Sequence, residues 1–388
     1  MGVFAGPEIV EDGLVLALDA GNTKGYDKYE NLITYSEKIG GSSSPYGWVN
    51  QNSIETDVDT PDVSDPSGGN SASKLTNGST NPASQTLKPS SLSATVYTAS
   101  VYLRTLSGTE TASFNVFLKS SPYTTIATSG ELTITSEWRR YDITTSTATS
   151  ADYNFGIQVR SGTIYAWGAQ LEQGSSLTDY YATTGTTKTR GSVVSSGIGT
   201  LTGTLTNGVG YDNVNGGSLS FDGTNDYISF SSNPSLTNQI TVEVWVKLED
   251  PQGPNNAGLI LGRESSYRMI YYSTSVDWIC STENNSWYST GTVIAASSLS
   301  LYTQIYQIVG TYDGSNNRIY VNGTLRNTNT NAISGNIRTN GTYYLMRTIA
   351  TNVDWGQGII YSHKLYNRAL TASEIKQNFN ATRGRFGI

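Results

Sequence analysis

The stretch that decides the fold is Ile240-Thr241-Val242-Glu243-Val244-Trp245-Val246-Lys247-Leu248. Every second residue of this stretch is aliphatic, and the positions between them include Glu243, Trp245 and Lys247. Side chains of an extended chain alternate between the two faces of a sheet, so the aliphatic residues share one face. The pattern predicts an antiparallel strand with one face in a hydrophobic core and the other face more polar.

Turn residues divide the chain into short segments of this kind. The same alternation returns at 14–19 and 153–160. Asp-Gly and Asn-Gly pairs, which suit the positive φ angles of tight hairpins, separate further segments. Near the C-terminus, Thr371 and Glu374 have the spacing of a capping box, which predicts a short helix at 371–380 that closes an open end of a sandwich. These signals predict an all-β protein of two antiparallel β-sandwiches with one short C-terminal helix.

The composition and charge of the chain limit the kinds of partner that we expect it to bind. Its 388 residues include 40 Gly, 26 Tyr and a single cysteine, and the formal net charge is −7. A chain of this charge is poorly suited to neutralise phosphates, so we expect neither nucleic acid nor an anionic membrane surface as a partner. The sequence shows no apolar run long enough to cross a membrane and no leading basic and apolar segments of an export signal. We therefore expect no membrane insertion and no export by the usual signal.

Five segments of the C-terminal half follow one another in a characteristic order. They are 216–228, 241–246, 310–314, 319–323 and 366–375. On these segments the chain from residue 191 onward resembles the concanavalin A-like, laminin-G-type jelly roll of phage and marine-virus structural proteins. The opening segment 12–22 also resembles the first strand of that jelly roll, although it is far away along the chain.

The residues between these two parts have a character of their own. Segments 30–37 and 165–174 resemble the ends of the carbohydrate-binding-module-like β-sandwiches that recur in phage tail fibres, and 137–141 adds to the likeness. A compact sandwich can be inserted into a loop of another domain, because its termini often lie close together. The resemblances imply a discontinuous jelly roll of residues 1–27 and 189–388, with residues 28–188 inserted as a second sandwich.

Catalysis is not expected. A glycosidase needs two carboxylates at a set separation, and Glu243 stands alone between aliphatic residues. Nucleophilic catalysis usually needs a positioned histidine, and the only one is His363, which beside Lys364 is interpreted as a surface residue. We therefore predict no catalytic residues.

Asp222, Asn225 and Asp226 form the densest cluster of side-chain oxygens. Lectin-like jelly rolls often hold Ca²⁺ with loop carboxylates, so the resemblance implies that these three residues are candidate Ca²⁺ ligands. The alternative is that the two aspartates cap their own turn by accepting hydrogen bonds from backbone N–H groups.

Aromatic side chains in polar, loop-like surroundings are candidates for stacking on sugar rings. The candidates are Trp48, Trp278, Trp287, Tyr288 and Trp355. The alternative for each is partial packing against the sandwich, with the polar edge of the ring at the surface.

These observations lead to one leading hypothesis and two alternatives. The leading hypothesis is a non-enzymatic phage virion protein, assembled in the bacterial cytoplasm, that displays lectin-like modules as a capsid decoration or as part of a tail or fibre. Its expected partners are other virion proteins and host surface glycans, with a homo-oligomer left open. The alternatives are a dedicated host-glycan adhesin or receptor-binding tail fibre, and a polysaccharide-cleaving enzyme, since one fold can serve all three.

Overall fold

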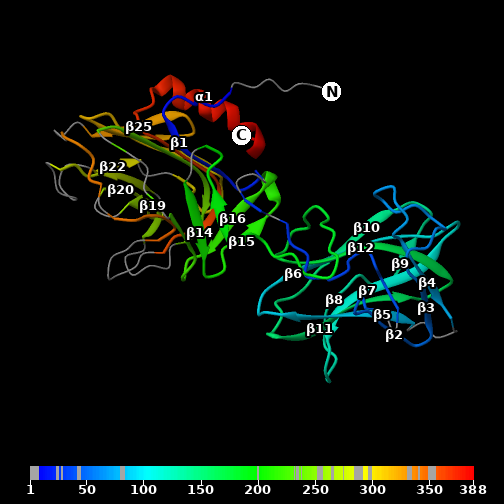
Figure 1. The fold of residues 1–388 in the computed structure, drawn as a ribbon. Coiled ribbons are helices and arrows are strands. Elements are labelled where there is room, and N and C mark those ends of the chain that lie inside the picture. The colour runs from blue at the N-terminus through cyan, green and yellow to red at the C-terminus, as the bar shows by residue number, and fades with distance from the viewer. Residues whose placement is uncertain are drawn as a thin grey trace. The chain divides into compact units, whose positions relative to one another are not determined.

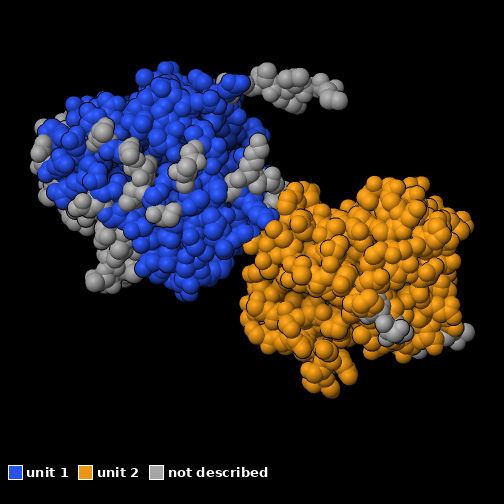
Figure 2. Space-filling view, viewed as in Figure 1, with its two compact units in different colours: residues 1–28, 191–388 blue, residues 29–190 orange. Residues whose placement is uncertain are grey.

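The computed structural model divides the chain into two compact units. Unit 1 comprises residues 1–28 and 191–388, and unit 2 comprises residues 29–190 (Figure 2). The residues that the structure describes are 8–22, 26–27, 29–41, 45–78, 84–198, 201–230, 232, 236, 238–250, 257–263, 266–273, 275–283, 292–295 (backbone only), 299–329, 334–339, 341–347 and 355–388. Within them, all strand pairs are antiparallel and the one α-helix is short and C-terminal, which confirms the predicted all-β class (Figure 1).

The first sheet of unit 1 has eight strands in the described part of the chain. In order across the sheet, seven of them are β15 (Gly210–Asp212), β16 (Ser218–Asp222), β27 (Gln357–Tyr366), β18 (Ile240–Leu248), β23 (Tyr306–Tyr312), β24 (Asn317–Val321) and β25 (Thr324–Asn329). The eighth, β1 (Leu14–Asp19), pairs with β27, so that Leu18 lies opposite His363. One of the first strands of the chain is thus hydrogen-bonded to the last.

The second sheet of unit 1 also has eight described strands. In order they are β13 (Val193–Ser195), β14 (Thr202–Thr206), β17 (Tyr227–Phe230), β26 (Tyr343–Leu345), β19 (Gly258–Arg263), β20 (Tyr267–Tyr271), β21 (Val276–Cys280) and β22 (Thr292–Ala295). A short 3₁₀ helix, η1 (Val214–Gly216), connects β15 to β16.

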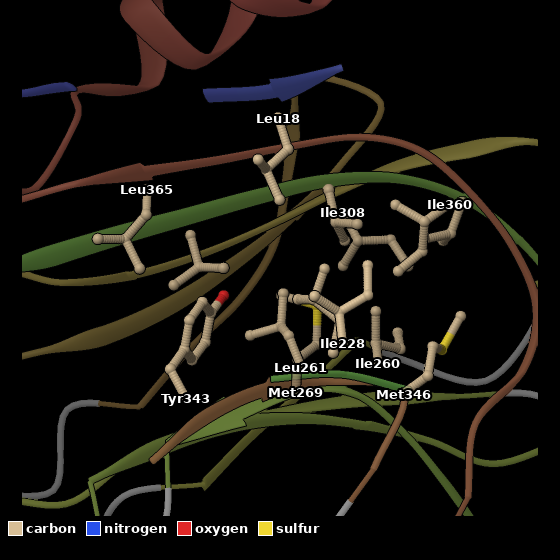
Figure 3. Close-up of a cluster of buried hydrophobic side chains, with 14 of the residues drawn as sticks. Leu18, Ile228, Ile260, Leu261, Met269, Ile308, Tyr343, Met346, Ile360 and Leu365 are labelled. Atoms are coloured by element: carbon tan, nitrogen blue, oxygen red, sulfur yellow. The ribbon is translucent and has the colours of Figure 1, made fainter. Parts of the chain in front are cut away.

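The core of unit 1 lies between its two sheets. Leu18, Ile308 and Ile360 project from the first sheet and meet side chains of the second, including Ile228 and Met269 (Figure 3). All five are buried, and full burial of one such side chain contributes about 1.5–3 kcal/mol to stability. Strand β18 contributes its five aliphatic residues to this core, as its alternation predicts.

Helix α1 (Ala372–Thr382) lies over the outer face of the first sheet. It begins with the predicted capping box, in which the Thr371 side chain accepts the Glu374 N–H. Phe379 of the helix stacks on Trp245 of β18, with 5.8 Å between ring centroids. The helix therefore covers a sheet face rather than an open end, because the outer face of β18 carries the large apolar Trp245. The 3₁₀ helix η2 (Arg383–Phe386) follows and adds Phe386, 4.5 Å from the Trp245 ring.

A polar network is buried beneath α1. Lys364 Nζ lies 2.8 Å from Glu243 Oε1, and Asn378 Nδ2 donates to Glu243 Oε2 over 2.7 Å. Glu243 and Asn378 have no exposed surface, and Lys364 retains 7%. All three side chains find partners, so the carboxylate, the ammonium and the amide are compensated despite their burial.

Unit 2 is a second sandwich, built from eleven strands in the described part of the chain. One sheet has the order β10 (Arg139–Thr144), β6 (Tyr97–Arg104), β12 (Thr163–Gln173), β4 (Ser73–Asn77) and β3 (Ile54–Asp57). The other has the order β2 (Val49–Gln51), β5 (Gln85–Leu92), β11 (Ala151–Val159), β7 (Glu110–Leu118) and β8 (Thr125–Thr128), with β9 (Leu132–Ile134) paired to β7. The core between them is apolar and includes Leu75, Val101, Phe114, Phe155 and Ile157.

Candidate functional site

Three aromatic rings and one guanidinium group gather on the outer face of the second sheet of unit 1. They belong to Tyr227, Tyr344, Arg347 and Trp355, which we call the platform. Tyr227 and Tyr344 stand next to core residues in β17 and β26, so the alternation of each strand turns their rings outward. Arg347 and Trp355 form an isolated backbone bridge beside these strands. All four side chains are half-buried, so each keeps exposed surface.

The rings of the platform surround the guanidinium group. Its carbon lies 4.5 Å from the centroid of Tyr227, 5.5 Å from that of Tyr344 and 5.4 Å from that of Trp355. The Tyr227 ring is 5.9 Å from each of the other two rings. These are cation–π distances, and three such contacts fix the orientation of Arg347 without a carboxylate.

Arg347 has no polar partner within the described part of the chain. Its Nε is buried and has no hydrogen bond, and no ion pair to the guanidinium occurs there. Other arginines of unit 1 differ: Arg385 Nη1 lies 2.9 Å from both carboxylate oxygens of Asp19, and Arg368 Nη2 lies 2.7 Å from Glu374 Oε1. The platform therefore combines apolar ring surface with a fixed, unused set of N–H donors. That combination suits a ligand with a flat apolar face and several oxygen acceptors.

The predicted Ca²⁺ cluster lies at the turn between β16 and β17. Asp222 Oδ1 accepts the Thr224 N–H over 2.8 Å and the Asn225 N–H over 3.3 Å, and Asp226 Oδ2 accepts the Asp222 N–H over 3.2 Å. The two aspartates thus cap the turn, which is the alternative that the sequence left open. Burial and the neighbouring Asp222 charge raise the pKa of Asp226 to about 6, although the Asp222 N–H opposes the shift.

These residues fit Ca²⁺ poorly. Ca²⁺ takes six to eight oxygen ligands, whereas the buried oxygen without a hydrogen bond in this turn is Asp226 Oδ1. Among the described residues, no three or more His, Cys, Asp or Glu side chains are grouped so that they could hold a metal ion.

Two of the predicted sugar-stacking residues are core residues, and their prediction is wrong. Trp278 has no exposed surface, because on β21 it faces the core, where its Nε1 donates to the Thr311 carbonyl over 3.1 Å. Trp48 is 2% exposed and lies edge-on to Phe155 in the core of unit 2. Neither indole can offer a face to a sugar.

The other three predicted sugar-stacking residues are not shown to be core residues. Trp355 is half-buried on the platform. Trp287 and Tyr288 lie outside the described residues. Sequence reasoning missed Tyr227, Tyr344 and Arg347; the alternation at 227–230 is the signal that would have placed the Tyr227 ring outside the core.

His363 is also not the surface residue that its neighbour Lys364 suggested. It has no exposed surface, because β27 lies in the interior of the first sheet and the His363 ring points between the sheets. Burial lowers its pKa to about 4, although a hydrogen bond to the Glu243 carbonyl opposes the shift. Since α1 covers Glu243, neither group is accessible to a substrate.

Unit 2 carries a second aromatic cluster with a different organisation. The Trp167 and Tyr180 rings are 4.6 Å apart, and Tyr102 lies 5.5 Å from Trp167. Trp167 Nε1 donates to the Ser71 hydroxyl over 2.8 Å, and the hydroxyls of Tyr180 and Ser36 lie 2.6 Å apart. The polar atoms of two of these rings are thus engaged with loops, so the cluster fastens the loops to the sheet.

Comparisons with known proteins bear on unit 1. Residues 222–376 match the family described as the concanavalin A-like lectin/glucanases superfamily. No curated protein matches the chain.

Among the described residues, no helix is long and apolar enough to cross a membrane.

Several solved structures are similar to part of the chain. The binding domain of Paraclostridial Mosquitocidal Protein 1 is 13% identical with a TM-score of 0.38, and the match covers 46% of this chain and 47% of that one. The botulinum neurotoxin type G receptor-binding domain is 15% identical with a TM-score of 0.36, and the match covers 46% of each chain. The botulinum neurotoxin serotype D ligand-binding domain in complex with N-acetylneuraminic acid is 14% identical with a TM-score of 0.38, again over 46% of each chain. The matches therefore span less than half of each of these structures. Together with the sheets described above, the family match shows that unit 1 contains a concanavalin A-like lectin/glucanase-type jelly-roll domain.

Proposed function

We propose that this protein is a non-enzymatic component of a phage particle that binds host-surface glycans through the platform of unit 1. The observation that carries the glycan-binding part is the platform itself, in which three half-buried rings surround a guanidinium group that has no polar partner among the described residues. The domain around it has a lectin-like fold.

The platform matches the mixed character of a sugar ring. One face of a pyranose ring presents C–H groups, which pack on an aromatic ring, and its rim presents hydroxyl oxygens, which accept hydrogen bonds. The Tyr227, Tyr344 and Trp355 rings supply the apolar contact, and Arg347 supplies the donors. Because the cation–π contacts already fix Arg347, little side-chain entropy is lost when a ligand binds.

The burial of two ionisable groups supports a binding role over a catalytic one. Glu243 is paired with Lys364 beneath α1, and His363 lies in the core. Neither can reach a glycosidic bond, so neither can act in the hydrolytic alternative.

Glycan binding is tested with purified protein on an array of bacterial surface polysaccharides and host oligosaccharides. We expect binding to at least one glycan and a loss of about 10-fold to 100-fold in affinity in Trp355→Ala, because truncating a central aromatic residue of an interface typically costs about 2 kcal/mol or more. Tyr123→Ala is the control, since Tyr123 is 67% exposed on unit 2 and should leave binding unchanged. Thermal melting establishes that both variants fold.

Two results would overturn the glycan-binding proposal: no glycan bound by wild-type protein, or equal affinities for wild type and Trp355→Ala. The placement in a particle is tested separately, by mass spectrometry of purified virions from a host that produces the protein. We expect its peptides at a fixed stoichiometry to the capsid protein. Their absence from the particles would overturn the virion role and leave glycan binding to stand alone.

A further inference from the structure

We infer that the platform selects a sugar that carries a carboxylate, with Arg347 as the residue that determines this specificity. The inference rests on the proposed function of the same site and adds the chemical class of the ligand.

The N–H donors of Arg347 are unused in the described part of the chain. A guanidinium group carries five N–H donors and no acceptor. In the described structure the Arg347 Nε is buried without a hydrogen bond, and no Asp or Glu neutralises the charge. A buried donor left unpaired is unfavourable, so a ligand that pairs it recovers that cost on binding.

A carboxylate suits these donors better than a hydroxyl group does. A carboxylate accepts two parallel N–H bonds from one guanidinium group, and such charge-assisted bonds are roughly twice as strong as neutral ones. A sugar hydroxyl offers one oxygen and no charge. The donors of Arg347 therefore discriminate between a carboxylated sugar and its neutral counterpart, while the aromatic rings accept either.

Two acidic residues of the described chain, Asp222 and Asp226, lie close to Tyr227 of the platform along the sequence. Asp226 directly precedes Tyr227, but its side chain is 4% exposed and accepts the Asp222 N–H. Asp222 Oδ1 is occupied by two backbone N–H groups of the same turn. Neither carboxylate pairs with Arg347, so among the described residues the guanidinium charge is left for a ligand.

The rest of the protein does not favour an acidic ligand. The formal net charge is −7, so the protein as a whole does not attract an acidic polymer. A preference for a carboxylated ligand must then come from a local contact, and Arg347 supplies one. Removing a different arginine should leave the preference intact.

The test is calorimetric titration of the full-length protein with matched ligand pairs. One pair is an oligogalacturonate and its carboxyl-reduced galactose counterpart, and the other is sialyllactose and lactose. In wild type we expect at least a 10-fold preference for the charged member of one pair. Whichever pair shows this preference tells whether the ligand is a uronic acid or a sialic acid.

The variants test the role of Arg347. Arg347→Gln should reduce the preference to less than 3-fold, and Arg347→Lys should keep part of it, because a lysine retains the charge and loses the bidentate geometry. Arg326→Gln is the matched control, since it removes the same charge from an exposed position on β25 and should behave as wild type.

The outcomes separate this inference from the proposed function. If neutral and charged members bind equally, or if Arg347→Gln keeps the preference, the inference is wrong and the glycan-binding proposal stands. If no member of either pair binds but a neutral glycan on the array does so through Trp355, the inference is again wrong. If no glycan binds at all, both are wrong.

Discussion

The Tyr343 hydroxyl and His363 Nε2 lie 2.6 Å apart in the core of unit 1. On the other side of the ring, His363 Nδ1 lies 2.9 Å from the backbone carbonyl of Glu243, which can only accept a hydrogen bond. Nδ1 therefore carries the proton, and Nε2 accepts the proton of the Tyr343 hydroxyl. Burial raises the pKa of Tyr343, so this hydroxyl keeps its proton. The pair links β26 of one sheet to β27 of the other.

Acid should destabilise the protein through His363. Its pKa falls from 6.5 to about 4 on folding, because burial disfavours the imidazolium. The unfolded state then binds a proton below pH 6.5 while the folded state does not, so stability present above that pH is lost as the pH falls toward 4. The loss attributable to His363 is about 3 kcal/mol. Urea unfolding at pH 4.5 and pH 7.5 should show it as a difference that His363→Gln lacks; a variant with the same pH dependence as wild type would contradict the assignment.

Removing one member of the buried ion pair should cost more than removing both. Lys364→Met leaves the Glu243 carboxylate beneath α1 with Asn378 as its remaining side-chain partner, and loss of one member of a buried pair typically costs about 3–5 kcal/mol. Lys364→Met combined with Glu243→Met should recover at least half of that stability, since it removes the uncompensated charge. A double-mutant cycle from urea unfolding measures the coupling, and additive losses would show that the pair does not interact.

A methyl group at Gly310 should destabilise unit 1. A Cβ at this position on β23 would collide with the indole ring of Trp278, which is fully enclosed in the core. Overpacking of this kind typically costs about 1–3 kcal/mol. Gly384→Ala is the control, because nothing lies within 4 Å of its added Cβ. If both variants melt at the wild-type temperature, Trp278 is not buried against β23.

Asp226→Asn should stabilise the protein at neutral pH. The pKa of Asp226 is raised to about 6 by burial and by Asp222, so its ionised form weakens the folded state above that pH. The penalty is relieved as the pH falls from 6 toward the unfolded value of 3.8, and the advantage of the amide variant should vanish near pH 4. Melting temperatures across this range measure it. Ca²⁺ and EDTA should leave the wild-type melting temperature unchanged, whereas a rise with Ca²⁺ that Asp226→Asn abolishes would show that the turn binds the ion.

The sequence predicts those elements whose signals are local. The alternation at 240–248 predicts the inward residues of β18, and the spacing of Thr371 and Glu374 predicts the start of α1, because both patterns depend on neighbours along the chain. What covers a side chain depends on distant residues. His363 and Lys364 are adjacent, yet one is enclosed between the sheets and the other is covered by α1.

The candidate site follows the same division. Trp278 stands before a polar segment, but the alternation of β21 turns it toward Gly310 on a strand of the other sheet. The platform brings together residues from three separate segments, which are joined by the pairing of β17 with β26 and by the backbone bridge between Arg347 and Trp355. No pattern along the chain predicts that the Tyr227 ring and the Arg347 guanidinium group are in contact.

The most direct measurement is a crystal structure of the full-length protein with the glycan that binds it most tightly. The account predicts a sugar ring in van der Waals contact with Trp355 and a ligand oxygen within hydrogen-bonding distance of the Arg347 guanidinium. A ligand seated on unit 2, or on unit 1 away from these two side chains, would contradict it.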